Sequence, residues 1–233
     1  YTRLLTEAPE VPAEELKAAV RWRIKDLIDF HINDAALDVF DVPGFEGTGM
    51  AREMYVVAAR NQAIQERVDL MEAAGIPLDV IDIPEMAQRN IAALLPEDVG
   101  GVALLSLNAR GGLITLSRQG VIYLSRPIAT GLIDLSGTGG RAGHFDQIVL
   151  EVQRSLDYFE SHFRQAPIRN LVLAPLPQEI PGFIDYLNSS LNVTAGTLDL
   201  NPLLDCNGEL PIALQTRCFT TIGAALRVEE KAL

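Results

Sequence analysis

Cysteine is scarce in this chain, and its scarcity excludes two kinds of protein. The 233 residues include only two cysteines, Cys206 and Cys218. Two thiols cannot build the disulfide framework of a small secreted domain, and these two lie too far apart for a CxxC metal site. We therefore expect two reduced thiols in a cytoplasmic protein.

Long apolar runs are also missing. No stretch approaches the roughly 18 consecutive apolar residues that a membrane-spanning helix needs, and no signal peptide is visible. We therefore expect no direct membrane insertion. The sequence begins at Tyr1, without methionine and already inside a strand-like stretch. This start leads us to expect that an N-terminal portion of the protein is absent from the chain.

Basic residues are the third shortage. The chain has 19 lysines and arginines against 31 acidic residues, which gives a net charge of −12. Arg21, Arg23 and Lys25 are close in sequence, but on a helix they point in different directions. A negative summed field opposes nonspecific binding to nucleic acid. We therefore expect no nucleic-acid partner.

The apolar content, in contrast, is sufficient for a folded core. Hydrophobic residues make up 48% of the chain and charged residues 21%, as in ordinary globular proteins. The length suits one large domain or two small ones.

The first 75 residues predict a small α+β unit. Hydrophobic periodicity and turn residues predict strands at 1–8, 35–43 and 53–60, helices at 12–30 and 61–75, and a loop at 44–50. Leu16, Val20 and Ile24 form one face of the first helix. Asn61 is the expected cap of the second helix, and Gly75 its expected end.

The remainder of the chain predicts an α/β domain. The same patterns predict strands at 76–83, 101–107, 112–118, 121–127, 168–176 and 192–200, loops at 129–143 and 201–205, and helices at 84–95, 142–165, 180–191 and 218–228. Pro84 suits the first position of its helix. A meander of three strands followed by alternating helices and strands implies a sheet that mixes antiparallel and parallel pairs.

Familiar catalytic and metal-binding patterns are not found. His31, His144 and His162 lack the spacing of metal ligands, and no G-x-S-x-G motif is present. The glycine-rich stretch from Leu135 to Phe145 precedes a helix, so it could bind an anion at the helix N-terminus. It has neither lysine nor P-loop spacing, so an ordinary loop is the competing interpretation.

The chain resembles the PilM/MshI family of type IV pilus biogenesis proteins, which have an actin-like (FtsA-like) fold. The resemblance rests on five stretches, which are "EELKAAVRWRIKDLIDFHINDAALDVFDV", "VDLMEAAGIPLDVIDIPEMAQRN", "GVIYLSRPIATG", "LNVTAGTLDLNPLLD" and "TTIGAALR". Each stretch is weak alone, but their order matches the family over nearly the whole chain, and most closely its MshI branch, from the mannose-sensitive haemagglutinin (MSHA) pilus.

The resemblance implies a fold of two ribonuclease-H-like lobes. Residues 1–76 would be a small α+β subdomain inserted in the first lobe, 77–99 would return to that lobe, and 100–233 would form the second lobe. The start of the first lobe would precede Tyr1.

The resemblance also implies where a nucleotide site would lie. The family's first phosphate loop would precede Tyr1. The second is a D-x-G hairpin whose carboxylate handles Mg²⁺, and here Ser106 and Asn108 occupy its positions, while Gly111 and Gly112 preserve the turn. Asn108 can adopt a left-handed turn conformation, which would preserve the shape of the hairpin.

The third loop of the family is a glycine pair that lies next to the adenine. Here the strand leads into Ala174 and Pro175, although Pro181 and Gly182 of the same loop survive. Proline removes an amide donor and fixes φ. Two degenerate loops point to a fold that no longer hydrolyses ATP.

The resemblance therefore implies a non-catalytic cytoplasmic scaffold without a cofactor. It would bind the cytoplasmic tail of a PilN-like inner-membrane protein in a groove between the inserted subdomain and the first lobe. Trp22 and Phe30 are the candidate contacts, although either could instead belong to the core or cover a sheet edge.

The alternative is a nucleotide-binding actin-like ATPase that uses ATP and Mg²⁺. It would need a carboxylate outside the usual position, and Asp98, Asp134 and Asp146 are the nearest in sequence.

Overall fold

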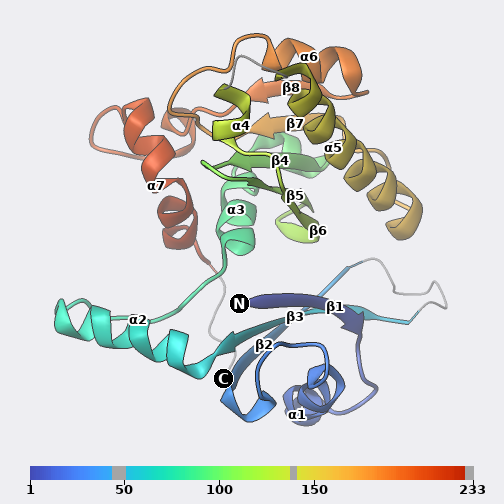
Figure 1. Cartoon of the computed structure of the whole chain (residues 1–233), viewed down its shortest axis with the longest axis vertical. Coiled ribbons are helices and arrows are strands. Elements are labelled where there is room, and N and C mark those ends of the chain that lie inside the picture. Colours follow the sequence, from blue (N-terminus) through green and yellow to red (C-terminus); the bar gives the residue numbers. More distant parts are fainter. Residues whose placement is uncertain (44–50, 137–140, 229–233) are drawn as a thin grey trace. The chain divides into compact units, whose positions relative to one another are not determined.

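The chain forms two compact units, Tyr1–Ile81 and Asp82–Leu233 (Figure 1). The computed structural model describes residues 1–43, 51–136 and 141–228. The predicted loop at 44–50 lies outside the described residues. The family resemblance implies a return segment of the first lobe at 77–99, and residues 82–99 of that segment are part of the second compact unit.

The first unit is a three-stranded antiparallel sheet with two helices (Figure 1). Its strands lie in the order β1-β3-β2. Its elements are β1 (Thr2–Glu7), α1 (Ala13–Ile24), the 3-10 turn η1 (Ile32–Asp34), β2 (Ala35–Asp41), β3 (Glu53–Arg60) and α2 (Asn61–Ala73). The strands predicted at 1–8, 35–43 and 53–60 are confirmed.

Helix α1 covers one face of this sheet. Val20 and Ile24 are fully buried against Met54 and Val56 of β3, as the apolar stripe predicts. The helix ends at Ile24 and not at Phe30, so its predicted length is wrong. The chain turns after Ile24 because Ile28, Phe30 and Ile32 pack back onto the same core, which a continuous helix could not allow.

Helix α2 has no buried residue. The prediction that Asn61 caps it is wrong, because Asn61 lies within the helix and Arg60 precedes it. The Asn61 amide instead donates to the carbonyl oxygen of Asn33. Gly75 follows the helix with φ of +67°, which a glycine adopts at no steric cost.

The predicted strand at 76–83 is also wrong. This segment has no regular structure, and no other described strand pairs with it. Ile76, Leu78, Val80 and Ile81 are exposed. An alternating apolar pattern needs a neighbouring strand before it forms a sheet, and periodicity alone does not supply that neighbour.

The second unit is a five-stranded mixed sheet in the order β6-β5-β4-β7-β8 (Figure 1). Its elements are α3 (Pro84–Ala92), η2 (Pro96–Val99), β4 (Val102–Leu107), β5 (Gly112–Arg118), β6 (Val121–Ile128), α4 (Leu132–Ser136), α5 (Arg141–Phe163), β7 (Asn170–Leu173), α6 (Phe183–Ser190), β8 (Thr194–Thr197), η3 (Asn201–Leu203) and α7 (Ile212–Ala225). The meander β4-β5-β6 is antiparallel, whereas β7 and β8 join it in parallel.

Helices cover both faces of this sheet. Helices α3 and α7 enclose an apolar cluster that includes Leu104 of β4 and Phe219 of α7. On the other face, the Tyr123 ring of β6 meets Phe159 and Phe163 of α5 with centroids 5.2 and 5.3 Å apart. Phe159 and Phe163 of α5 therefore belong to the core.

Two predictions about the helices of the second unit are wrong. Residues 132–136 form α4 inside a stretch predicted to be a loop, and Leu135 of this helix is buried. Helix α7 begins at Ile212, well before the predicted start at Cys218. Its first turn follows Pro211, a residue whose fixed φ suits a helix start.

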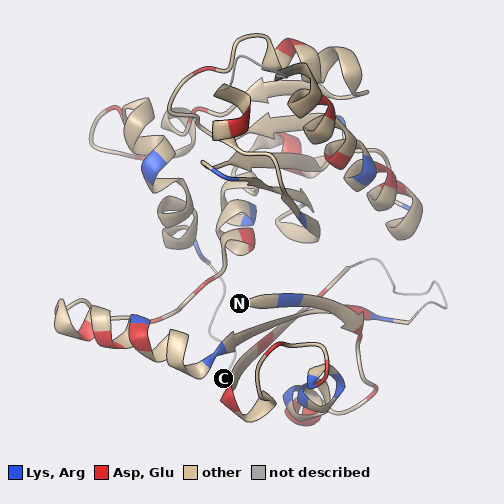
Figure 2. Cartoon of the chain, in the orientation of Figure 1, with Lys and Arg blue, Asp and Glu red and all other residues tan. Residues whose placement is uncertain are grey.

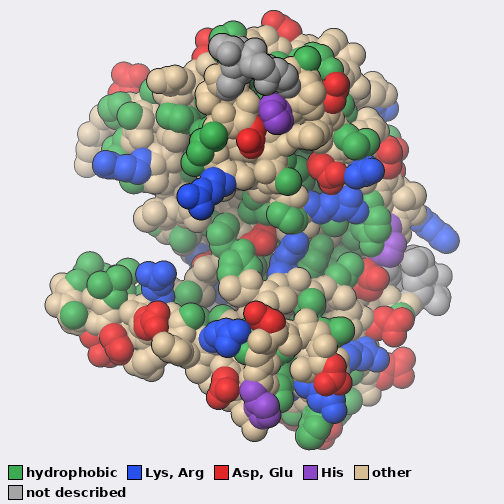
Figure 3. All heavy atoms as spheres, viewed as in Figure 1, with side chains coloured by type: hydrophobic (Ala, Val, Ile, Leu, Met, Phe, Trp, Pro, Cys, Tyr) green, Lys and Arg blue, Asp and Glu red, His purple; other side chains and the backbone are tan. Residues whose placement is uncertain are grey.

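Acidic side chains are spread over the helices of both units (Figure 2). On the face shown in Figure 3, basic side chains alternate with acidic and apolar ones. Within the described ranges, no helix is both long and apolar enough to cross a bilayer.

Candidate functional site

The turn between β4 and β5 is closed by its own side chain. Asn108 Oδ1 accepts from the backbone N–H groups of Arg110 and Gly111 at 3.0 and 3.1 Å. The backbone N–H of Asn108 donates to the Gly111 carbonyl oxygen at 2.8 Å. Three amides that could face a phosphate are therefore already occupied within the turn.

Asn108 does not adopt the left-handed conformation that is open to an asparagine in a turn. Among the described non-glycine residues, only Gln119 and Arg164 have positive φ. Asn108 shapes the turn through an Asx-type hydrogen bond of its side chain, which needs no left-handed backbone.

The glycines of this hairpin are required by close packing. A Cβ at Gly111 would lie 2.6 Å from the carbonyl oxygen of Ile128, and one at Gly112 would lie 2.7 Å from the Leu107 side chain. The start of α4 rests on the turn, where the Leu132 N–H donates to the Asn108 carbonyl oxygen at 2.9 Å. A Cβ at Gly131 would collide with the turn backbone. The pattern that suggests a phosphate loop therefore also serves internal packing.

Ser106 belongs to a buried polar network. Its hydroxyl donates to Gln88 Oε1 at 2.9 Å. The Gln88 amide donates in turn to the Leu104 carbonyl oxygen at 2.5 Å and to Thr115 Oγ1 at 3.1 Å. Gln88 lies on α3 and is buried. Ser106, which the resemblance places at the carboxylate position, thus links strand β4 to helix α3 through a hydrogen bond.

Sequence reasoning missed Gln88. The available signal was its position three residues before Ile91 on a predicted helix, which places it on the apolar face. A polar residue on a buried face needs hydrogen-bond partners.

The third loop is also built into the core. Ala174 is buried, and its N–H donates to the Leu105 carbonyl oxygen at 2.8 Å. Pro175 is buried beside it and has no amide to donate. Gly182 precedes α6 with φ of +77°, and a Cβ there would meet nothing within 4 Å, so the backbone conformation explains that glycine.

One cavity lies beside the hairpin turn. Its volume is about 580 Å³, and the residues that line it are Ala109, Leu132, Ile133, Leu135, Ser136, Pro177, Gln178, Glu179, Ile180 and Pro181. None of them is basic, and Glu179 carries negative charge. The cavity therefore lacks the cations that phosphate recognition uses.

The three alternative carboxylates are engaged elsewhere. Asp98 is buried at the opposite end of β4, where it accepts from the Gly120 N–H at 2.6 Å. Burial raises the pKa of Asp98, and the hydrogen bonds from Gly120 and Ser117 oppose that shift. Asp134 accepts from the Gly131 N–H at 2.9 Å. Asp146 accepts from the Tyr186 hydroxyl.

The glycine-rich stretch from Leu135 to Phe145 is only partly described, and the described histidines belong to no metal centre. Residues 137–140 of the glycine-rich stretch lie outside the described part of the chain. Over the ranges that are described, no group of three His, Cys, Asp or Glu side chains could hold a metal ion.

The two aromatic partner candidates differ in exposure. Trp22 on α1 is 73% exposed, with Lys25 Nζ 5.5 Å from its ring centroid. The interpretation that Trp22 covers a sheet edge is therefore not supported. Phe30 is half-buried against the core of the first unit, and the Arg60 guanidinium lies 4.7 Å from its ring.

Comparison with known proteins identifies a family. The family model of the type IV pilus assembly protein PilM matches residues 3–130. The solved structure of a PilM–PilN type IV pilus biogenesis complex is similar at a TM-score of 0.70 and 18% identity, over 97% of this chain and 74% of that one. No curated protein matches.

Two further solved structures are more distant. The cytoplasmic domain of EpsL, an inner-membrane component of the Vibrio cholerae type II secretion system, has a TM-score of 0.46 at 13% identity, over 81% of this chain and 68% of that one. A Bacteroides thetaiotaomicron protein with an actin-like ATPase fold has a TM-score of 0.47 at 8% identity, over 94% of this chain and 69% of that one.

The predicted fold class is confirmed, since the α/β chain with mixed sheets has the actin-like fold. The family model spans more than half of the chain. The chain therefore belongs to the family of the type IV pilus assembly protein PilM.

Proposed function

We propose that this protein is a non-catalytic scaffold of type IV pilus biogenesis, of the MSHA type. It binds the cytoplasmic tail of a PilN-like inner-membrane protein and reaches the membrane only through such partners. Membership of the PilM family and the similarity to a PilM–PilN complex support this role. The proposal keeps 1–76 as an inserted subdomain, 77–99 as part of the first lobe and 100–233 as the second lobe.

The proposal that the protein is non-catalytic rests on the hydrogen bonds within the hairpin turn between β4 and β5. Phosphate binding needs free amide donors, and Mg²⁺ needs oxygen ligands of high charge. Asn108 accepts from two of the turn amides, and Ser106 supplies a neutral hydroxyl that already donates to Gln88. The protein thus uses these positions for packing.

The contact assigned to the tail is Trp22. Indole rings combine a large apolar area with a rigid side chain and are enriched at the energetic centres of interfaces. The exposure of Trp22, at 73%, leaves that area available. Phe30 packs against the core of the first unit, and it would contribute to tail binding by supporting the surface near Trp22.

The direct test is binding of a synthetic peptide with the sequence of the PilN-like protein's cytoplasmic tail, measured by isothermal titration calorimetry. We expect Trp22→Ala to weaken binding about tenfold or more, as truncation of an interface anchor does. The control is Leu150→Ala, which removes an exposed apolar side chain from α5 and should leave the affinity unchanged. A folded wild type without affinity for the peptide would refute the scaffold. Unchanged binding by Trp22→Ala would refute only the assignment of Trp22.

A further inference from the structure

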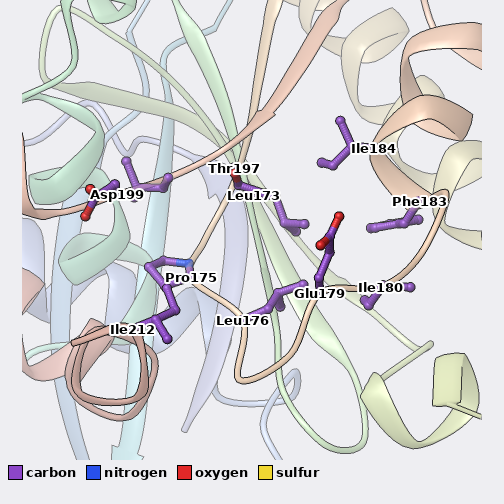
Figure 4. A pocket seen from close by; sticks show the side chains of 11 residues that line it. Leu173, Pro175, Leu176, Glu179, Ile180, Phe183, Ile184, Thr197, Asp199 and Ile212 are labelled. Atoms are coloured by element: carbon purple, nitrogen blue, oxygen red, sulfur yellow. The ribbon is translucent and has the colours of Figure 1, made fainter.

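A second cavity of the second unit lies at the carboxyl ends of β7 and β8, between α6 and the start of α7 (Figure 4). Its volume is about 440 Å³. The residues that line it are Leu173, Pro175, Leu176, Glu179, Ile180, Phe183, Ile184, Thr197, Leu198, Asp199 and Ile212. The carboxyl ends of parallel strands are the usual position of ligands in α/β sheets, and this volume lies within the range of small-ligand sites.

The walls of this cavity are mainly apolar. Leu173 and Phe183 are almost fully buried. Ile212, at the first position of α7, is 52% exposed and lies at the rim. Figure 4 shows Ile184 and Phe183 on one side of the space and Ile212 on another. An apolar group that enters would cover side chains that are now partly open to water.

The charged residues that line this cavity, Glu179 and Asp199, are both acidic. Figure 4 shows the Glu179 carboxylate pointing into the space between Leu173 and Phe183. Glu179 forms no hydrogen bond or ion pair with any residue of the described ranges. None of the eleven lining residues is basic.

The second carboxylate, that of Asp199, is held in place. Its Oδ1 atom accepts from the Asn201 backbone N–H at 3.0 Å, the Asn201 amide at 2.8 Å and the Gln215 amide at 2.8 Å. The backbone N–H of Asn201, and then the Gln215 amide, lower the pKa of Asp199. Asp199 is therefore ionised at neutral pH, and Glu179 is the second acidic residue that lines the cavity.

These features select a class of ligand. Two carboxylates without a basic neighbour repel nucleotides, phosphates and acidic peptides. Apolar walls favour an aliphatic or aromatic group. The complementary ligand joins an apolar side chain to a cation.

We propose that this cavity binds a peptide segment in which an aliphatic side chain is adjacent to a lysine or arginine. The aliphatic side chain enters between Leu173, Phe183 and Ile184, and the neighbouring cation pairs with Glu179. This docking site is independent of the contact at Trp22, and it stands whether or not the protein binds a PilN-like tail.

The test uses methyl resonances of isoleucine, because Ile180, Ile184 and Ile212 all line the cavity. The full chain, labelled with ¹³C at isoleucine δ-methyl groups, is titrated with the peptide acetyl-Ala-Leu-Arg-Ala-amide. We expect saturable shifts of these three methyl signals. The matched peptide acetyl-Ala-Leu-Glu-Ala-amide should cause none. Equal responses to both peptides, or no response to the arginine peptide at millimolar concentration, would overturn the proposal.

A substitution tests the role of the charge. Glu179→Gln keeps the size of the side chain and removes its charge, and we expect it to weaken the arginine peptide about threefold, as the loss of one exposed ion pair would. Glu160→Gln on α5 removes an exposed carboxylate outside the cavity and should leave affinity unchanged. Equal affinity of Glu179→Gln and Glu160→Gln would show that Glu179 does not recognise the cation and would refute the proposed pairing.

Discussion

At the scale of single residues, the half-buried Ser106 and the buried Gln88 form one hydrogen-bonded unit. The carboxamide of Gln88 spans α3 and two strands, through the carbonyl oxygen of Leu104 and the hydroxyls of Ser106 and Thr115. The resemblance of the sequence to the PilM family predicts that Ser106 stands at the carboxylate position, and this stays a prediction. It does not reveal the partner, because a hydrogen bond between residues 18 positions apart depends on how the helix docks on the sheet.

Gln88→Ala should destabilise the second unit by about 1–3 kcal/mol, because it leaves buried acceptors unpaired. Amide hydrogen exchange of β4 and β5 measures this, and a loss of about 2 kcal/mol corresponds to roughly 30-fold faster exchange of the most protected amides. Gln178→Ala, in an exposed loop of the same unit, is the matched control. Equal protection in the two variants would show that the network does not stabilise the fold.

Asp98 gives a prediction about pH. Burial raises its native pKa above the usual value of 3.8, so the ionised form costs stability at neutral pH. That cost falls as the pH drops through the raised pKa, and it is absent below about 3.8. The stability of the wild type should therefore rise relative to that of Asp98→Asn on acidification. Urea unfolding of both proteins across this pH range is the measurement, and a constant difference would contradict it.

At the scale of elements, the predictions succeed where local periodicity determines the structure and fail where contacts with distant residues determine it. Strands β2 and β3 and helix α5 follow from periodicity because their own neighbours in the chain pack against them. The predicted strand at 76–83 does not form, and α4 forms within a predicted loop. These failures share a cause, since each segment's structure depends on contacts with distant residues.

The contact between α3 and α7 depends on one glycine. A Cβ at Gly223 would collide with the carbonyl group of Ala87, and Asn90 Nδ2 donates to the Gly223 carbonyl oxygen at 2.9 Å. Gly223→Ala should destabilise the second unit by about 1–3 kcal/mol, the usual cost of overpacking. Thermal unfolding followed by circular dichroism is the measurement.

Gly143→Ala is the matched control for this prediction. Gly143 lies in α5, and a Cβ there would meet nothing within 4 Å. This substitution should stabilise the protein by roughly 0.5–1 kcal/mol, because alanine is the better helix former. If Gly223→Ala behaved like Gly143→Ala, the close approach of α3 and α7 would be wrong.

At the scale of the whole molecule, we propose separate roles for three sets of residues in an actin-like fold. The hairpin turn is occupied by its own packing, Trp22 offers an exposed ring on the first unit, and the acidic cavity of the second unit suits a cationic peptide. The fold class could be predicted from the sequence, whereas the degenerate nucleotide-site positions stay a prediction from the family resemblance. The cavity could not, because Leu173, Phe183, Asp199 and Ile212 come from four different segments.

The proposed scaffold assembles partners and does not bind nucleotide. The most direct measurement is the thermal unfolding midpoint of the protein with Mg²⁺-ATP over a concentration series. A ligand at 100 times its dissociation constant stabilises the native state by about 2.7 kcal/mol, which shifts the midpoint by several degrees. We predict no shift at any ATP concentration. A midpoint that rises with ATP concentration would contradict the account.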